Sequence, residues 1–176
     1  MAIRKVLVYP DKRLRDKAQP VERVDDSIRR LLDDLAETMY AEPGVGLAAP
    51  QVGVSLRVFV IDLKSPEGGE LLEFVNPRFL SREGELAWKE GCLSFPGISE
   101  EVTRHARVSV EALDRNGKRF TIDGDELLAV AMQHEYDHLE GRLLIDHVSF
   151  LKKRMIRREL AKLAVERAAG TDAEVG

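Results

Sequence analysis

The chain has 176 residues, of which 44% are hydrophobic and 33% are charged, and its formal net charge is −4. This composition supports a buried core, excludes wholesale disorder, and argues against a protein that binds DNA through its whole surface. No apolar run reaches the roughly 20 residues of a membrane-spanning helix, and the single cysteine, Cys92, excludes an internal disulfide. We therefore expect a cytoplasmic protein with neither membrane nor DNA as a partner, with one domain over residues 1–169 and a disordered tail over residues 170–176.

The first predicted element is a helix that begins near Asp25 and ends before Pro43-Gly44. An Asp-Asp-Ser sequence at its start supplies N-capping side chains. Apolar residues recur along this helix with helical spacing: Ile28, Leu31, Leu32, Leu35 and Met39. The stretch 44–53, which is rich in glycine, alanine and proline, is too irregular for a helix. Residues 56–63 and 71–75 are predicted strands because they are rich in β-branched and large apolar side chains.

The second half of the chain predicts a hairpin and then two helices. Polar and apolar residues alternate over 106–113, and an Asp-Arg-Asn-Gly turn leads to a partner strand at 119–122. A helix is expected over 125–139 with Gly141 as its stop, and a last helix over 150–168. The order of elements predicts an α+β fold, in which a mostly antiparallel sheet packs around the helix 125–139, with one helix near each terminus.

The helix 125–139 contains the motif H-E-x-x-H, from His134 to His138. Residues four apart lie on the same face of a helix, so both histidines can bind one metal ion. Glu135 lies about 100° around the helix from His134 and can reach a metal-bound water without being a ligand. In this arrangement the ion acidifies the water and the carboxylate removes its proton during attack on a carbonyl. The alternative is a solvated helix face with two incidental histidines.

A catalytic metal site normally has three protein ligands and one open position. Cys92 is the obvious third candidate, although most free cysteines behave as small buried hydrophobic residues. Glu140 or His147, downstream of the motif, could also complete the site, and spacing alone does not decide among the three. Apart from this role, His147 and His105 are expected at the surface.

Three segments of the chain, taken together, resemble a known family. They are G-V-G-L-A-A-P-Q at 44–51, E-G-C-L-S at 90–94 and Q-H-E-Y-D-H at 133–138. They resemble, in the same order, the three signature segments of peptide deformylase, and the similarity extends from residue 11 to the final helix. The resemblance implies an enzyme that removes the formyl group from the N-terminal formyl-methionine of nascent bacterial polypeptides, releasing formate and a free α-amine.

The resemblance also implies a role for each residue at the reaction centre. Three residues would hold a divalent metal ion, with water as the fourth ligand: Cys92, His134 and His138. Glu135 would act as general base and then as general acid toward the departing amine. Gln51 and the backbone N–H of Leu93 would donate hydrogen bonds to the oxyanion. The family favours Fe(II) in the cell, and the donor set also suits Zn(II), Ni(II) or Co(II) in the purified protein.

Other residues are expected to bind the substrate or to orient the ligands. By the resemblance, the carbonyl of Gly46 contacts the substrate backbone, which is bound as an added strand, and Gly91 belongs to the same surface. The pocket for the methionine side chain is expected to contain five residues: Val45, Trp88, Leu127, Val130 and Ala131. Glu90 and Arg104 are expected to form a buried pair that orients the cysteine loop. The alternative is an exposed pair of little energetic consequence.

The last helix is strongly basic, with seven Lys or Arg and two Glu between residues 151 and 168. Its apolar residues predict a stripe against the body of the protein: Leu151, Met155, Leu160 and Leu163. The basic face is either merely solvated or docks on ribosomal RNA near the polypeptide exit, as this helix does in some members of the family.

Two other functions remain open from the motifs alone. An H-E-x-x-H peptidase, or another amide hydrolase, would use the same water activation on a different bond and would cleave unblocked peptides. A structural metal site in a non-enzymatic protein would need a fourth protein ligand, and the chain has no second cysteine to supply one.

Overall fold

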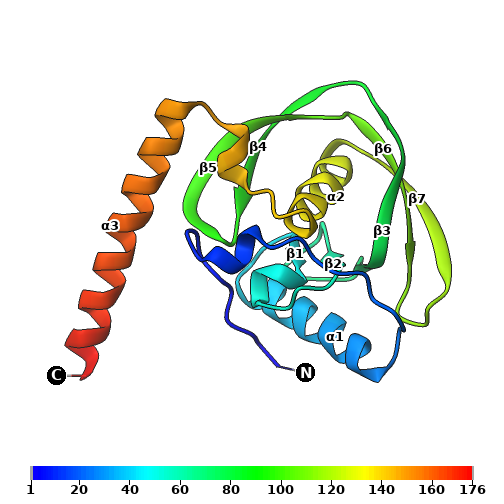
Figure 1. The fold of residues 1–176 in the computed structure, drawn as a ribbon, viewed down its shortest axis with the longest axis horizontal. Helices are drawn as coiled ribbons and strands as arrows, with labels where there is room; N and C mark the ends of the chain where they lie inside the picture. The colour runs from blue at the N-terminus through cyan, green and yellow to red at the C-terminus, as the bar shows by residue number, and fades with distance from the viewer. Residues whose placement is uncertain (1, 176) are drawn as a thin grey trace.

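Figure 1 shows the computed structural model, which describes the backbone of residues 2–175 and the side chains of residues 2–169. The α-helices are α1 (Asp26–Ala41), α2 (Glu126–Leu139) and α3 (Phe150–Val175). The strands are β1 (Gly46–Ala48), β2 (Val58–Ile61), β3 (Leu72–Glu83), β4 (Leu86–Cys92), β5 (Phe95–Arg104), β6 (Arg107–Leu113) and β7 (Arg119–Asp125). Short 3₁₀ helices are η1 (Lys12–Arg15), η2 (Ala49–Val52) and η3 (Leu144–His147).

Every pair of neighbouring strands in the two sheets is antiparallel. Five strands form one sheet in the order β1-β2-β3-β6-β7, and β4 and β5 form a separate hairpin. The strands curve around α2, which lies in the middle of the molecule, while α1 packs below and α3 stands at one side (Figure 1). The predicted α+β class, with a mostly antiparallel sheet around a central helix, is confirmed. No helix within residues 2–175 combines the length and apolar character needed to cross a bilayer.

The structure differs from the sequence expectations mainly in the middle of the chain. The strand predicted at 71–75 continues as β3 to Glu83, through register shifts that let its polar second half pair with β6. The hairpin of β4 and β5 has no strong hydrophobic alternation and was not predicted, yet it carries Cys92 at its turn. At the C-terminus, the backbone of α3 is helical to Val175, beyond the predicted helix over 150–168.

Two apolar layers hold α2 and α1 on opposite sides of the small sheet segment formed by β1 and β2. One core cluster packs α2, through Met132 and Ala129, against Phe59 and Phe74 of the five-stranded sheet. Gly124 on β7 allows this close packing, because a Cβ there would lie 2.5 Å from the Met132 side chain. A second cluster packs the five predicted apolar residues of α1 against β1, β2 and the start of β3.

The N-terminus of α1 is capped as its sequence predicts. The carboxylate of Asp25 accepts hydrogen bonds from the backbone N–H groups of Ser27 and Ile28, at 3.1 and 3.2 Å. Such a cap satisfies donors that have no partner inside the helix. The helix ends at Ala41, just before the Pro43-Gly44 pair.

The residues of α3 that pack against the body differ from the predicted apolar stripe. Ile156 and Leu160 are buried in a third cluster with Leu7 and Phe95, whereas Leu151 and Met155 are 66% and 59% exposed. Successive residues on a helix are about 100° apart, so a contact line centred on Ile156 turns Met155 away from the body. The sequence analysis missed Ile156 and therefore placed the stripe on the wrong side of the first turns.

Gly141 ends α2 and also fixes how the N-terminal segment passes beneath it. Its φ is +73°, and a Cβ at this position would overlap the backbone carbonyl of Arg15. We expect Gly141→Ala to destabilise the protein by more than the roughly 1–2 kcal/mol that a left-handed residue with a side chain costs. Gly117→Ala, with a φ of +77° but only ordinary contacts at 3.7 Å to Val24, is the matched control in urea unfolding. Equal losses in the two variants would contradict the close contact with Arg15.

Candidate active site

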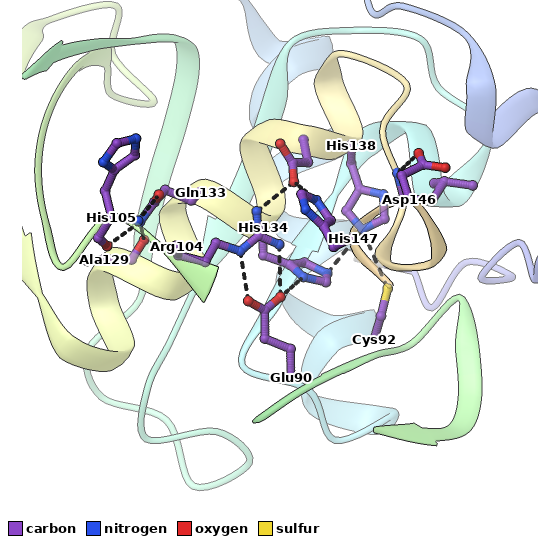
Figure 2. Close-up of polar contacts among 12 residues, drawn as sticks. Glu90, Cys92, Arg104, His105, Ala129, Gln133, His134, His138, Asp146 and His147 are labelled. Atoms are coloured by element: carbon purple, nitrogen blue, oxygen red, sulfur yellow. Dashed lines mark hydrogen bonds and ion pairs between the residues drawn. The ribbon is translucent and has the colours of Figure 1, made fainter. Parts of the chain in front are cut away.

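Three potential metal ligands from two distant segments meet beside α2. His134 and His138 lie one helical turn apart, and their Nε2 atoms are 3.3 Å from each other. The Sγ atom of Cys92 lies 3.5 Å from Nε2 of His138. Figure 2 shows the ring of His134 between Glu90 and His138, with the sulfur of Cys92 facing His138. The donor atoms of these three residues all lie within 4.8 Å of one another.

Two of the three separations between donor atoms fit a single tetrahedral ion. With metal–nitrogen and metal–sulfur bonds of about 2.05 and 2.3 Å, tetrahedral angles give about 3.3 Å between nitrogens and about 3.6 Å between nitrogen and sulfur. The Nε2–Nε2 and Sγ–Nε2 distances of 3.3 and 3.5 Å match these values. The donor chemistry also fits, because one thiolate and two imidazoles suit a divalent transition metal. Burial lowers the pKa of His138, which keeps its imidazole neutral and able to bind a cation.

The other two candidates for the third ligand are engaged elsewhere. Glu140 accepts a hydrogen bond from Arg57 at 2.7 Å and pairs with Lys17 at 3.5 Å. His147 lies 2.8 Å from the carboxylate of Asp137. Of the three alternatives that spacing left open, the geometry therefore favours Cys92.

A local irregularity brings Cys92 to the metal ligands on α2. The pairing of β4 with β5 shifts register between Gly91 and Cys92, so that Cys92 faces Phe95 across a two-residue turn. Such a bulge redirects the side chains at the end of a hairpin. Phe95 is fully buried and stacks on Tyr9, with 5.1 Å between ring centroids, which fixes the turn against the N-terminal segment.

Glu135 points into the same site from the next position on the helix. It is 4% exposed, and its Oε1 atom has no hydrogen-bond partner among the residues that the structure describes. A Cβ on Gly46 would lie 2.6 Å from Oε2, so a side chain larger than glycine on β1 would displace the carboxylate. Burial raises the pKa of Glu135 to about 7. An ion beside it would favour the ionised form.

The side chain of Gln51 is fixed by contacts on both ends of its amide. Its Oε1 accepts the backbone N–H of Ala48 at 3.0 Å, and its Nε2 donates to Oγ of Ser94 at 3.0 Å. A longer contact of 3.5 Å joins Nε2 to Sγ of Cys92. The amide therefore spans from η2 to the turn that contains Leu93. Ser94, which is fully buried, was missed as a functional residue, although it closes the E-G-C-L-S segment.

A buried chain of charges holds His134 in place. Arg104, at the end of β5, donates two hydrogen bonds to Glu90, at 2.7 and 2.9 Å, and one to Asp137 at 2.6 Å. Glu90 in turn lies 2.8 Å from Nδ1 of His134, which leaves Nε2 of that ring for the ion. Burial alone would raise the pKa of the Glu90 carboxyl, but its hydrogen bonds from the Arg104 guanidinium hold that pKa below its usual range.

The structure places Glu90 and Arg104 in the buried arrangement rather than the exposed one, and it extends this network beyond the pair. Asp137 connects Arg104 to His147, which is exposed at the surface as expected and joins the network through its Nε2 atom. No sequence signal marks these contacts, because Arg104 and Asp137 are 33 residues apart. His105 is exposed, as expected.

A cavity of about 850 Å³ opens onto Glu135 and two of the three potential ligands, Cys92 and His134. All seven residues expected to bind substrate lie in its wall: Val45, Gly46, Trp88, Gly91, Leu127, Val130 and Ala131. Gln51, Cys92 and Leu93 line it as well. The sequence analysis missed several other parts of the wall, notably Lys5, Ile98 and Arg167, which come from segments without a motif. A cavity of this size, with an apolar side and a convergent polar side, is typical of a ligand site.

Comparisons with known proteins agree on one family. The family model described as polypeptide deformylase matches residues 3–154. The peptide deformylase of Alkalilimnicola ehrlichii is 49% identical over 176 residues, covering 100% of this chain and 99% of the relative. Peptide deformylase 1 of Burkholderia multivorans is 52% identical over 164 residues, covering 93% and 90%.

Solved structures give the same result. The crystal structure of a peptide deformylase from Legionella pneumophila has a TM-score of 0.91 at 50% identity, covering 95% of this chain and 98% of that one. Peptide deformylase from Ehrlichia chaffeensis in complex with actinonin has a TM-score of 0.86 at 39% identity, covering 92% and 98%.

We expect Glu90→Gln to weaken divalent metal binding by about 10–100-fold, because the amide holds His134 and Arg104 less firmly than the carboxylate does. Removing one charge from this buried network should also lower the free energy of unfolding by roughly 3 kcal/mol. Competition with a chromophoric chelator measures Zn(II) or Co(II) affinity, and urea unfolding measures stability. Glu100, the cross-strand partner of Glu90, pairs with Lys152 at the surface, so Glu100→Gln is the control. Equal metal affinity in both variants would contradict the role of Glu90.

Proposed function

The chain belongs to the polypeptide deformylase family and is a peptide deformylase, and on this premise we propose how its own residues remove the formyl group from the formyl-methionine of nascent polypeptides. One observation supports the assignment of residues above all. The donor atoms of Cys92, His134 and His138 converge, and Cys92 and His134 line a large cavity together with the buried carboxylate of Glu135. Residues 1–169 would form the single catalytic domain, working in the bacterial cytoplasm.

Cys92, His134 and His138 would hold one divalent ion, for which we infer Fe(II) in the cell. When bound there, the ion would polarise the formyl carbonyl and acidify a water molecule. Glu90 occupies Nδ1 of His134 and so orients that ring for this task, and burial keeps His138 neutral. Metal analysis of protein purified without oxygen tests the choice of iron. A native content of zinc alone would contradict it.

Glu135 would transfer the proton that the reaction has to move. Its carboxylate removes a proton from the water that attacks the formyl carbon, and then gives it to the amine nitrogen as the C–N bond breaks. The products are formate and the free α-amine of methionine. The lack of a hydrogen-bond partner on Oε1, within the described part of the chain, supports this role, because a lone pair of that oxygen is not committed to another donor.

Gln51 and the backbone N–H of Leu93 would stabilise the negative charge that develops on the formyl oxygen. A side-chain amide has two N–H donors, and Gln51 uses one of them for Ser94. The second lies on the side of Cys92, next to the ligand cluster. Since both ends of the amide are held, it needs little rearrangement during the reaction, which is the condition for effective stabilisation of an oxyanion.

The peptide backbone of the substrate would bind along β1. This strand pairs with β2 on one side only and is the edge of the five-stranded sheet, so its outer edge can accept an extended peptide. Gly46 lies at the beginning of β1, directly beside Glu135, which would place the substrate backbone close to the carboxylate. The methionine side chain would then contact the apolar residues of the cavity: Val45, Trp88, Leu127, Val130 and Ala131.

We also propose that the outer face of α3 docks on ribosomal RNA. Its basic residues are mostly exposed, among them Arg154, Arg158 and Lys162. Ile156 and Leu160 attach the helix to the body, which leaves this face turned away from the catalytic domain. A phosphate surface would therefore contact the helix without covering the cavity.

We expect Glu135→Gln to lower kcat for formate release by about 10²–10⁴-fold, because the amide cannot accept and return the proton. The assay uses a formyl-Met tripeptide and protein prepared anaerobically with Fe(II). The metal content of the variant should equal that of the wild type, which separates proton transfer from metal binding. The unformylated tripeptide is the control for peptidase activity. Cleavage of that peptide, or full activity of the variant, would contradict the proposal.

Replacing Arg154 and Arg158 together by Glu should weaken binding to purified ribosomes at least tenfold and reduce the slope of log K against log salt by roughly two. Hydrolysis of a free tripeptide should not change. Lys12 and Lys118 are exposed lysines outside α3, and their replacement by Glu is the matched control. Ribosome pelleting across a salt series makes the measurement. An equal loss in the control pair would show that only overall charge matters.

A further inference from the structure

A second groove, of about 650 Å³, lies between the N-terminal segment of the chain and the side of α3 that faces it. In Figure 1 the segment passes between α3 and the body. The walls are mainly apolar, with Val6 and Val8 on one side and Leu160 and Leu163 on the other. Ala161 and Ala164 also line the groove, and their small side chains leave space along this side of the helix.

The groove adjoins the active-site cavity. Four residues line both: Lys5, Val6, Val8 and Arg167. The N-terminal segment, which contributes to both linings, is also hydrogen-bonded to two segments of the candidate active site. The backbone N–H of Leu7 donates to the carbonyl of Gln51 at 2.7 Å, and that of Tyr9 donates to the carbonyl of Ser94 at 2.9 Å. The groove therefore has a fixed position relative to the reaction centre.

The rim of the groove is basic. Arg13 and Arg157 line it in addition to Lys5 and Arg167, whereas Asp11 is the one acidic residue of its lining. Asp11 is already paired with Arg13 at 2.8 Å. Arg157 donates to the hydroxyl of Tyr9 at 3.3 Å, which holds its side chain across the groove. An occupant with negative charges and some apolar surface complements this lining.

We propose that this groove binds the part of the substrate polypeptide that follows the residues held in the active-site cavity, with a preference for acidic side chains. The inference rests on the proposed function, because it takes the occupant to be the continuation of the formylated chain. A nascent polypeptide is long, and an extended chain advances about 3.3 Å per residue, so its later residues have to leave the cavity along some surface. The four shared lining residues place the groove directly beside the cavity, where the chain would leave it, and its charge selects the residues that it holds.

Peptides of two lengths test the proposal. One is the tripeptide formyl-Met-Ala-Ser, and the others are nonapeptides that begin with the same three residues. In the remaining six positions the nonapeptides carry Glu, Gln or Lys at alternate places. We expect the Glu nonapeptide to exceed the Lys nonapeptide in kcat/KM by about fivefold at low salt, through a lower KM. Because the charges are exposed, the difference should fade at high salt.

Variants on α3 locate the effect. Arg157→Glu should abolish the preference for the Glu nonapeptide, whereas Arg158→Glu, the same charge change on the next residue of the helix, should retain it. Ala161→Trp, which fills the groove, should raise KM for the Glu nonapeptide severalfold. Val165→Trp, at an exposed position of the same helix outside the groove lining, is its control. All four variants should hydrolyse the tripeptide as the wild type does, which reports that the catalytic centre is intact.

Equal hydrolysis of the Glu and Lys nonapeptides by the wild type would overturn the proposal. A preference that survives in Arg157→Glu, or that Arg158→Glu removes equally, would overturn it too, since the groove would then not be the source. Failure of the wild type to hydrolyse the tripeptide would contradict the proposed function instead, so the two can fail separately.

Discussion

The guanidinium of Arg104 is the interaction on which the geometry of the site depends. It lies at the end of β5 and joins Glu90 of β4 to Asp137 of α2, so one side chain ties the separate hairpin to the central helix. These are the two elements that carry the potential metal ligands. Taking such charges out of water costs several kcal/mol per ion, and only good geometry with further hydrogen bonds offsets that cost. The network therefore tolerates little displacement of β4 relative to α2.

The connection through Arg104 also determines where the other residues of the site lie. With Glu90 held, the ring of His134 has one orientation, and its Nε2 atom faces His138 and Cys92. With the hairpin held, the turn after Cys92 stays against Gln51 and the N-terminal segment, through the contacts of Ser94. The glycine at position 46 then leaves room for Glu135 at the edge of the sheet. His134, Gln51 and Glu135 are thus each positioned by a neighbour on another element, and no single helix or loop contains the site.

The sequence predicted the parts of the protein in which local patterns agree with the final packing. Helical spacing located α1 and α2, and the spacing of His134 and His138 placed two donors on one face. Spacing could not show that Cys92 lies beside these two histidines. Its position depends on the β4–β5 hairpin, whose hydrophobic alternation is weak, and on a bulge at the end of that hairpin. The resemblance of three short segments supplied that ligand instead. The contacts of Asp137 and His147 could not be predicted from the sequence either, because they form only when β5, α2 and η3 pack together.

The helix α3 shows where amphipathic patterns mislead. It carries apolar residues on two sides: Ile156 and Leu160 are buried, while Leu151, Met155 and Val165 are exposed. A prediction that assumes one apolar stripe combines residues from both sides of the helix. It therefore assigns to the contact with the body some residues that are exposed. Two apolar sides on one basic helix are expected when the helix has two different neighbours. One side attaches α3 to the body and forms a wall of the groove next to the active-site cavity, and the other is exposed. In the proposed function, α3 would connect catalysis within the cavity to the ribosomal surface that delivers the polypeptide.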